Sequence, residues 1–183
     1  MTTAVIALGA NLGERAANLR AAVELMEKEG LLLSAASSIW ETAPVPADQP
    51  PFLNAVVVGE TALAPGALLA ALKGIEAALG RRPGRRWAPR PIDLDILFYG
   101  DGVVTQPGLE IPHPRIAERA FVLAPLAEVL SGPLPVLGKT ALELLAATGS
   151  EGVARTALEL PLAGVMGAGR RRGLGGGGRP GGA

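Results

Sequence analysis

The chain has 183 residues, enough for one domain with a sizeable core, and 17 basic residues balance 17 acidic ones. Residues 1–160 carry 13 basic and 17 acidic side chains, whereas residues 161–183 carry four arginines and no acid. This acidic main part argues against a nucleic-acid partner, and the absence of Cys excludes disulfide bonds and thiolate metal sites. No apolar run reaches the ~18 residues of a membrane span, so we expect a cytoplasmic protein without a membrane partner.

The start of the chain predicts a strand followed by a helix. Residues 4–8 are continuously apolar and predict a buried strand, which the turn at residues 9–13 connects to a helix ending near Glu29. Asn11 followed by Glu14 resembles a capping box, in which the Asn side chain accepts from free amides at the helix start. The apolar stripe of this helix consists of Leu19, Ala22, Val23 and Met26.

The next stretch predicts two further strands joined by a rigid loop. Residues 31–40 predict one strand, the proline-containing segment 41–46 predicts the loop, and residues 52–61 predict the next strand. Because side chains alternate along a strand, Phe52 and Asn54 share one face. An Asn side chain offers two donors and one acceptor, which suits the polar edge of a fused heterocycle. The alternative is an Asn that bonds a neighbouring loop.

A second helix is predicted from Pro65, which suits a first helical turn, to Leu79. Its apolar stripe consists of Leu68, Leu72, Ile75 and Leu79. From Gly80 to Pro91 the chain is basic and irregular, because prolines within this loop forbid a helix. The loop carries five arginines, namely Arg81, Arg82, Arg85, Arg86 and Arg90. Since Arg binds phosphate through two parallel hydrogen bonds, the loop predicts a local anionic ligand.

The arginine loop leads directly into a predicted strand over residues 93–99, which begins with two of the chain's four Asp residues. Asp93 and Asp95 are two positions apart, so they point to one face of the strand, roughly 6.5–7 Å from each other. Two like charges at this spacing repel, and magnesium held by carboxylates and substrate phosphates would relieve the repulsion. The alternative is a solvated polar face of an edge strand. No Gly-x-x-x-x-Gly-Lys-Ser/Thr motif is present, so the pattern indicates a polyphosphate site without a P-loop.

Beyond this strand, residues 99–103 predict a hairpin turn and residues 111–115 predict an extended segment fixed by prolines. The segment contains His113, the only histidine, which is either structural or a ligand for phosphate. Two short helices are predicted over residues 123–130 and 140–147. They complete the regular part of the chain.

The order strand-helix-strand-strand-helix-strand predicts an α+β fold of the ferredoxin-like βαββαβ type, with an added hairpin and C-terminal helices. We expect this domain to span residues 1–160. From Gly164 the sequence is of low complexity and rich in Gly and Arg, so residues 161–183 are expected to form a flexible tail.

The segment Arg86-Trp87-Ala88-Pro89-Arg90-x-x-Asp93-Leu94-Asp95-Ile96-Leu97 resembles the signature of the 6-hydroxymethyl-7,8-dihydropterin pyrophosphokinases of folate biosynthesis. Agreement extends from Ala4 to about Leu145. It includes, in order, Gly9-Ala10-Asn11-Leu12-Gly13, Glu41-Thr42-Ala43-Pro44, Phe52-Leu53-Asn54-Ala55, Ile75-Glu76, Gly80-Arg81 and Ile111-Pro112-His113-Pro114. At two positions the chain departs from the pattern: it has Ala10 where the family usually has Ser, and Lys73 where many relatives have Gln. Lys73 would either reach a phosphate or be solvated.

The resemblance implies a site for a pterin beside a site for ATP. Phe52 and Phe121 would stack on the two faces of the pterin ring, and Asn54 would bond its polar edge. The backbone lining of this pocket would come from Thr42, Ala43, Pro44 and Val45. Nucleotide contacts are implied for Glu76, Arg81, Trp87, Arg90, His113 and Arg119. Asp93 and Asp95 would hold two magnesium ions, and the resemblance makes Arg81 and Arg90 catalytic together with them.

The implied reaction transfers the diphosphate of ATP to the hydroxymethyl group of 6-hydroxymethyl-7,8-dihydropterin and releases AMP. The hydroxyl oxygen would attack the β-phosphorus in line, with two magnesium ions and arginines offsetting the charge. One alternative is a two-metal phosphohydrolase, which would need more carboxylates or histidines. Another is a non-catalytic RNA-binding module of ferredoxin-like fold, which the acidic charge of the main part disfavours. We expect a monomer whose partners are ATP and the pterin.

Overall fold

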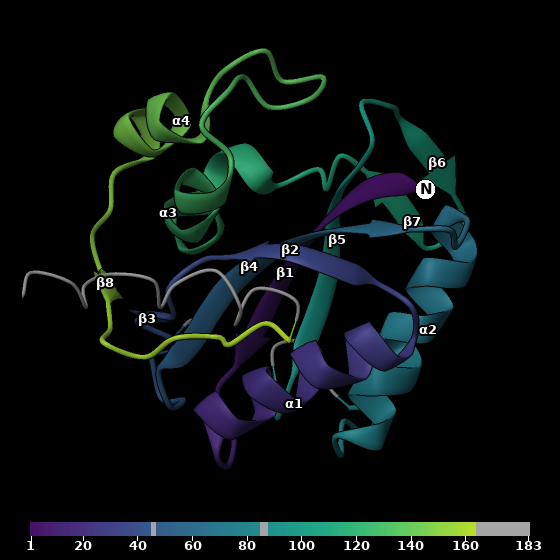
Figure 1. Ribbon diagram of the computed structural model, residues 1–183. Coiled ribbons are helices and arrows are strands. Elements are labelled where there is room, and N and C mark those ends of the chain that lie inside the picture. Colours follow the sequence, from purple (N-terminus) through teal and green to yellow (C-terminus); the bar gives the residue numbers. More distant parts are fainter. Residues whose placement is uncertain (45–46, 85–87, 164–183) are drawn as a thin grey trace, which may run out of the picture.

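The computed structural model describes residues 1–44, 47–84 and 88–163 of the chain (Figure 1). In chain order the elements are β1 (Thr2–Ala10), α1 (Arg15–Lys28), β2 (Leu32–Ala36), β3 (Trp40–Thr42), β4 (Phe52–Thr61), α2 (Pro65–Ala78), β5 (Asp93–Tyr99), β6 (Val104–Gln106), β7 (Leu109–Ile111), the 3-10 helix η1 (Ile116–Glu118), α3 (Ala120–Val129), α4 (Ala141–Thr148) and β8 (Val153–Arg155). The protein is a mixed structure of helices and an antiparallel sheet.

The main sheet is built around β1, which pairs with β4 on one side and with β5 on the other. Its strand order is β5-β1-β4-β3-β8, and β2 also pairs with β4. Each of these strand pairs is antiparallel. The register places Gly9 of β1 between Asn54 of β4 and Asp93 of β5. It likewise places Ala7 between Val56 and Asp95, so residues far apart in sequence form two rows across one face.

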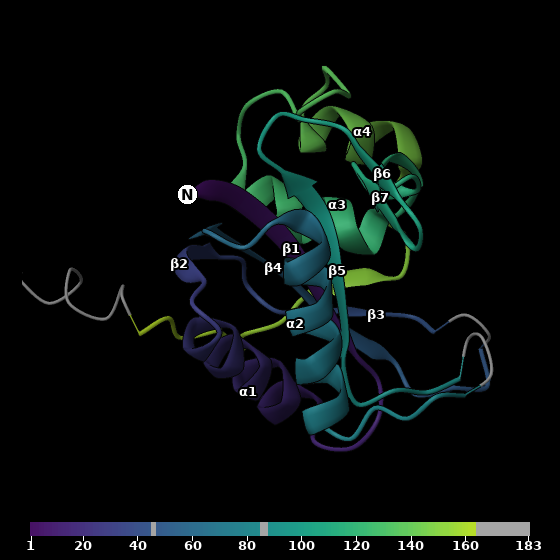
Figure 2. The ribbon, with the colours of Figure 1, turned by 90° about the vertical axis from the view of Figure 1, so that its right-hand side faces the viewer.

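Helices lie on both faces of the sheet. The helices α1 and α2 lie against one face, and α3 and α4 lie on the opposite side (Figures 1 and 2). The first face contributes residues such as Ile6, Leu8 and Leu94 to the larger core, where they pack with the predicted stripes of α1 and α2. Every residue of the predicted α1 stripe is buried, and Leu68, Leu72 and Ile75 of the α2 stripe are buried as well. The predicted stripe of α1 is therefore confirmed. The α2 stripe is confirmed except for Leu79, which is the C-cap residue of the helix and only partly buried.

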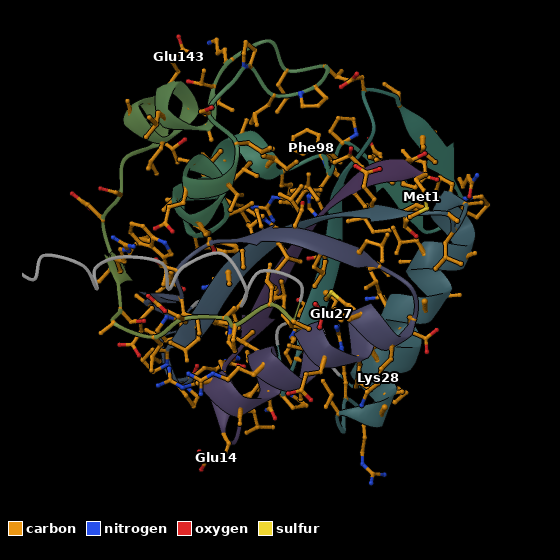
Figure 3. The ribbon with its side chains drawn as sticks, viewed as in Figure 1. Met1, Glu14, Glu27, Lys28, Phe98 and Glu143 are labelled. Atoms are coloured by element: carbon orange, nitrogen blue, oxygen red, sulfur yellow. The ribbon has the colours of Figure 1, made fainter. Side chains whose placement is uncertain are left out.

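The second face carries a smaller core beneath α3 and α4. Phe98, labelled in Figure 3, is buried there with Val5 and Val56 from the strands and Val122 and Leu126 from α3. This cluster occupies only part of the face. The two rows that contain Asp93 and Asp95 lie on this same face of the sheet. Residues of these rows line a cavity beside the cluster.

The prediction of one strand over residues 31–40 is wrong, because Ser37 divides this segment into β2 and β3. The hydroxyl of Ser37 accepts a hydrogen bond from the backbone N of Val56 at 2.9 Å, replacing a backbone carbonyl of a regular strand pair. The short strand β3 then pairs on its free side with β8, which the sequence pattern did not predict. Three-residue strands carry too little alternation to be recognised from sequence.

The predicted hairpin turn at residues 99–103 does not join β5 to a partner strand. Instead β6 pairs with β7 in a separate two-stranded sheet, and Val104 lies opposite Ile111. The turn of this hairpin contains Gly108, whose φ of 74° is in the left-handed region. The two C-terminal helices are present, and a capping box formed by Thr140 and Glu143 begins α4.

Leu160 and Leu162 are buried against the core that α1 and α2 form, so packed residues continue past the boundary expected at residue 160. The Gly/Arg-rich part from residue 164 lies outside the described residues. Within the described part of the chain, none of the helices combines the length and the apolar character that crossing a membrane requires.

Candidate functional site

A cavity of about 830 Å³ lies on the second face of the sheet. It brings together most of the predicted site residues, namely Thr42, Ala43, Phe52, Asn54, Glu76, Arg81, Arg90, Asp93, Asp95, His113, Arg119 and Phe121. Thr42 and Ala43 line it, whereas Pro44 is not among its lining residues, and its place at the pterin stays a prediction. Val45 and Trp87 lie outside the described residues.

Small residues of the central strand β1 line the base of this cavity. Ala7 and Gly9 line it between the aromatic and amide side chains of β4 and the two carboxylates of β5. The sequence predicted Gly9 in a turn, but it lies in the strand. A Cβ atom at Gly9 would be 3.1 Å from Oδ1 of Asn54, which is tighter than an ordinary contact. The absence of a side chain at Gly9 therefore permits close approach of the Asn54 amide, and it is not needed for a turn.

The β4 side of the cavity combines an aromatic ring with a fixed amide. Asn54 is 6% exposed, and its Nδ2 donates to Oγ1 of the equally buried Thr42 at 2.9 Å. Phe52 lies two positions before Asn54 on the same face of the strand. The amide is thus held in place by a neighbouring strand, and its Oδ1 lies beside Gly9.

The β5 side of the cavity holds an ion-pair network centred on Asp93. Oδ1 of Asp93 accepts from Nη1 of Arg81, and Oδ2 accepts from Nη1 of Arg90 at 3.0 Å. The same Nη1 of Arg81 lies 2.7 Å from Oε1 of Glu76. Burial acts to lower the pKa of Arg81, but Asp93 and Glu76 outweigh it and raise the pKa above its usual value. Arg81 therefore stays charged and bridges two carboxylates.

Asp95 lies further along β5, on the same face as Asp93. Burial raises the pKa of Asp95, and the charge of Asp93 raises it further. His113, followed by Lys73 and Arg119, acts to lower this pKa but does not cancel these effects. A carboxylate that is both buried and next to a like charge favours a bound cation.

The remaining side of the cavity is formed by His113 and Arg119, which precede α3, and by Phe121 within α3. The backbone N of His113 donates to the carbonyl of Leu97 at 3.2 Å, which holds the histidine segment against β5. Burial lowers the pKa of His113, and its Nδ1 accepts from the backbone N of Arg115 at 3.2 Å. In the neutral ring Nε2 then carries the proton and can donate to an anionic oxygen. The Arg119 guanidinium lies 5.6 Å from the ring centre of Phe121, which is 37% exposed.

Glu76 is a buried junction between α2 and β5. Its side chain is 3% exposed, and Oε1 accepts from the backbone N of Leu94 at 2.8 Å. Nζ of Lys73 lies 2.9 Å from Oε1 and 3.1 Å from Oε2, and Arg81 provides a further positive charge. Lys73 thus forms an ion pair with Glu76. The sequence had left open only a contact with phosphate or a solvated side chain.

Asn11 is a site-building residue that sequence reasoning missed. The predicted capping box is wrong, because the N-cap of α1 is Glu14, which makes no side-chain cap bond and points away from the protein in Figure 3. Asn11 is 1% exposed and exchanges two hydrogen bonds with the backbone of Arg90. Its Nδ2 also donates to the carbonyl of Pro50 at 3.3 Å. No local spacing reveals a partner 79 residues away.

The donors at the site suit a hard divalent cation shared with a phosphate ligand. Within the described ranges, no group of three or more His, Asp or Glu side chains is arranged to hold a metal by itself. Asp93 and Asp95 offer two carboxylates on one face, and both line the cavity. Magnesium commonly binds one or two carboxylates and takes its other ligands from water and substrate phosphates, so these residues fit it.

Known proteins resemble this chain in sequence. Over residues 5–131 it matches the family model of 7,8-dihydro-6-hydroxymethylpterin-pyrophosphokinase (HPPK). The 2-amino-4-hydroxy-6-hydroxymethyldihydropteridine pyrophosphokinase of Methylorubrum extorquens is 45% identical over 157 residues, which make up 85% of this chain and 99% of that protein. The protein of the same name from Bacillus subtilis is 47% identical over 69% of this chain and 77% of its own length.

Other relatives are much longer. The mitochondrial folate synthesis bifunctional protein of Arabidopsis thaliana is 53% identical over 69% of this chain, but the match covers only 23% of that protein. The chain thus spans about a quarter of the length of the bifunctional plant relatives. A solved structure of wild-type Plasmodium falciparum HPPK-DHPS with pteroate superposes with a TM-score of 0.69 at 17% identity, covering 84% of this chain and 47% of that one. This likeness concerns the fold alone. From the family-model match and the bacterial relatives, the chain belongs to the 7,8-dihydro-6-hydroxymethylpterin-pyrophosphokinase (HPPK) family.

Proposed function

We propose that this protein transfers the diphosphate group of ATP to the hydroxymethyl group of 6-hydroxymethyl-7,8-dihydropterin, giving AMP and the pterin diphosphate. The observation that carries this proposal is the composition of one cavity. A paired-carboxylate strand flanked by arginines forms one side of it, and an aromatic and amide-lined recess forms the other. The first side suits a polyphosphate with its cation, and the second suits a flat heterocycle with a polar edge.

In this proposal the β4 side holds the pterin. Phe52 and Phe121 stack on the ring, and Asn54, fixed by Thr42, bonds its polar edge. Nothing projects from Gly9 into the space beside that amide. A stacked ring held by directional hydrogen bonds would present its hydroxymethyl oxygen in a fixed direction, which provides the positional part of catalysis.

The β5 side, in the same proposal, holds ATP. Arg81 and Arg90 exchange their bonds to Asp93 for bonds to phosphate oxygens, and the Nε2 proton of His113 and the guanidinium of Arg119 provide further donors. Glu76 supports this cluster from beneath. Asp93 and Asp95 would hold two magnesium ions, and magnesium bound there would supply charge neutralisation for the phosphates. The arginines stabilise the charge that develops on the transferred group.

The proposal also includes the fold type, the domain organisation, the oligomeric state and the location of the protein. The strand order β5-β1-β4-β2, with α1 and α2 on one face, supports a ferredoxin-like arrangement extended by the β6–β7 hairpin and the C-terminal helices. We also propose a single catalytic domain with a separate C-terminal tail, a monomeric state and a cytoplasmic location.

The decisive experiment is an assay of AMP formation with ATP, magnesium and the hydroxymethyl pterin. The proposal predicts AMP and pterin diphosphate in equal amounts, with little AMP when the pterin is omitted. Release of inorganic phosphate or diphosphate without pterin would indicate a phosphohydrolase instead. Failure to form AMP under any of these conditions would contradict the proposal.

A further inference from the structure

Glu76, Lys73 and Arg81 form a charge arrangement that the reaction itself would disturb. The Glu76 carboxylate is 3% exposed, so its negative charge must be compensated by neighbours. Two cations contact it: Arg81 from the arginine loop and Lys73 from the preceding turn of α2. Arg81 also contacts Asp93 through the same Nη1 atom, so one guanidinium compensates two carboxylates.

Phosphate binding would draw Arg81 away from this arrangement. A guanidinium that forms parallel hydrogen bonds to a phosphate must give up bonds that it makes to carboxylates. Removing one partner from a buried ion pair is strongly unfavourable, because an uncompensated charge is left behind. Glu76 could therefore release Arg81 only if another positive charge stays on it.

Lys73 is placed to be that charge. Its Nζ lies 2.9 Å and 3.1 Å from the two oxygens of Glu76, so it contacts the whole carboxylate without the help of Arg81. Lys73 lies three residues before Glu76 on the same helix. This spacing keeps the two side chains together independently of the position of Arg81. The Lys73 side chain is 48% exposed, so its remaining N–H bonds can be made to water.

We propose that Lys73 is a positioning residue that keeps Glu76 charge-balanced, so that Arg81 can exchange its carboxylate partners for the phosphates of the nucleotide. This inference rests on the proposed function. Lys73 acts through Glu76 and Arg81, and it need not touch the nucleotide. If Lys73 loses its positive charge, Glu76 keeps Arg81 as its partner. The nucleotide then loses a hydrogen-bond donor, although the Arg81 side chain itself is unchanged.

The test is a double-mutant cycle on nucleotide affinity, measured by calorimetry with α,β-methylene-ATP and magnesium. Lys73→Met should weaken binding by about tenfold, the scale of coupling within one ion-pair network. Lys73→Arg keeps the charge and should remain close to the parent. In a Glu76→Gln background there is no charge to balance, so Lys73→Met should cost less than about twofold.

Two results would overturn the inference. One is parent-like affinity of Lys73→Met; the other is an equal loss in the parent and in the Glu76→Gln background, which would mean that Lys73 contacts the nucleotide directly. If Glu76→Gln does not fold, Arg81→Met provides the background, in which Lys73→Met should again add almost nothing and a full loss would overturn the inference. Pterin-dependent AMP formation by the parent tests the proposed function separately. If the parent is active and Lys73→Met binds the nucleotide as tightly as the parent, this inference alone is refuted.

Discussion

Asn11 and Arg90, 79 residues apart in the chain, are joined by two hydrogen bonds. The backbone N of Asn11 donates to the Arg90 carbonyl at 3.1 Å, and Oδ1 of Asn11 accepts from the backbone N of Arg90 at 2.9 Å. This pairing ties the end of β1 to the arginine loop just before β5. It fixes the backbone from which the Arg90 side chain reaches Asp93.

Asn11→Ala should therefore reduce both activity and stability. The substitution removes the acceptor for the Arg90 amide in a site that is 1% exposed, which should cost about 1–3 kcal/mol of unfolding free energy. We expect pterin-dependent AMP formation to fall by roughly tenfold, because small losses of alignment are costly in transfer reactions. Chemical denaturation and steady-state kinetics measure the two effects. Full activity of Asn11→Ala would contradict this reasoning.

Asp95→Asn should abolish most of the catalytic activity. It keeps the shape of the side chain but removes one of the two carboxylates proposed to hold magnesium. We expect turnover to fall by roughly a hundredfold or more, the scale of losing a central electrostatic element. Binding of α,β-methylene-ATP should become weaker in the presence of magnesium and change much less in its absence. Turnover within about twofold of the parent would exclude Asp95 as a metal ligand.

The same substitution should make the ligand-free protein more stable at neutral pH. Burial and Asp93 raise the pKa of Asp95 above its usual value of 3.8, so its charged form destabilises the folded state. The penalty is complete above the folded-state pKa and vanishes as the pH falls below 3.8, where the carboxyl becomes protonated in both the folded and the unfolded state. The stability advantage of Asp95→Asn should therefore be present at pH 7 and disappear on acidification. Denaturation of both proteins across this pH range measures it, and an advantage that grows towards low pH would contradict the assignment.

Phe121→Ala should weaken the binding of the pterin selectively. Phe121 lines the cavity and is 37% exposed, so it contributes less to the core than to a ligand surface. Loss of one aromatic stack should cost roughly 1–3 kcal/mol of pterin affinity. ATP affinity should change little, as titration calorimetry with each ligand can establish. Phe121→Tyr retains a ring and should behave like the parent; an equal loss of both ligands in Phe121→Ala would show a structural role instead.

Gly9→Ala should impair the pterin site, although it adds a single methyl group. Its Cβ would lie 3.1 Å from Oδ1 of Asn54, so the amide must move from the position in which Thr42 holds it. We expect pterin affinity to fall by roughly tenfold, because a displaced directional donor or acceptor loses most of its hydrogen bond. ATP affinity should change far less in the same titrations.

Gly74→Ala is the matched control for this prediction. Gly74 lies on the exposed side of α2, and a Cβ there would meet nothing within 4 Å. Ala should stabilise the helix by about 0.5–1 kcal/mol and leave both ligand affinities unchanged. If Gly9→Ala bound the pterin as tightly as this control does, close approach at Gly9 would be irrelevant to the site.

Features that depend on local periodicity could be predicted from the order of the residues. The predicted strand over residues 52–61 coincides with β4, and the apolar stripe of α1 is buried as predicted. Asp93 and Asp95 face the same side because alternation along a strand is a property of the backbone. Likewise, Pro65 starts α2, since its fixed φ suits a first helical turn.

Which of these elements lie side by side depends on how distant strands pair in the folded chain. Nothing local brings Gly9 between Asn54 and Asp93, because that neighbourhood results from pairing β1 with strands from two distant parts of the chain. The same holds for Asn11, whose side chain could have capped α1 but binds Arg90 instead.

Lys73 shows the same limit for charges. In sequence it is one more basic residue on an amphipathic helix, but the fold buries Glu76 beside it and brings Arg81 and Asp93 to the same point. The energy of a charge depends on its burial and on neighbours from other elements, which local spacing does not specify. The sequence therefore determined the chemical groups of the site, and the packing of β1, β4, β5 and α2 determined how these groups are coupled.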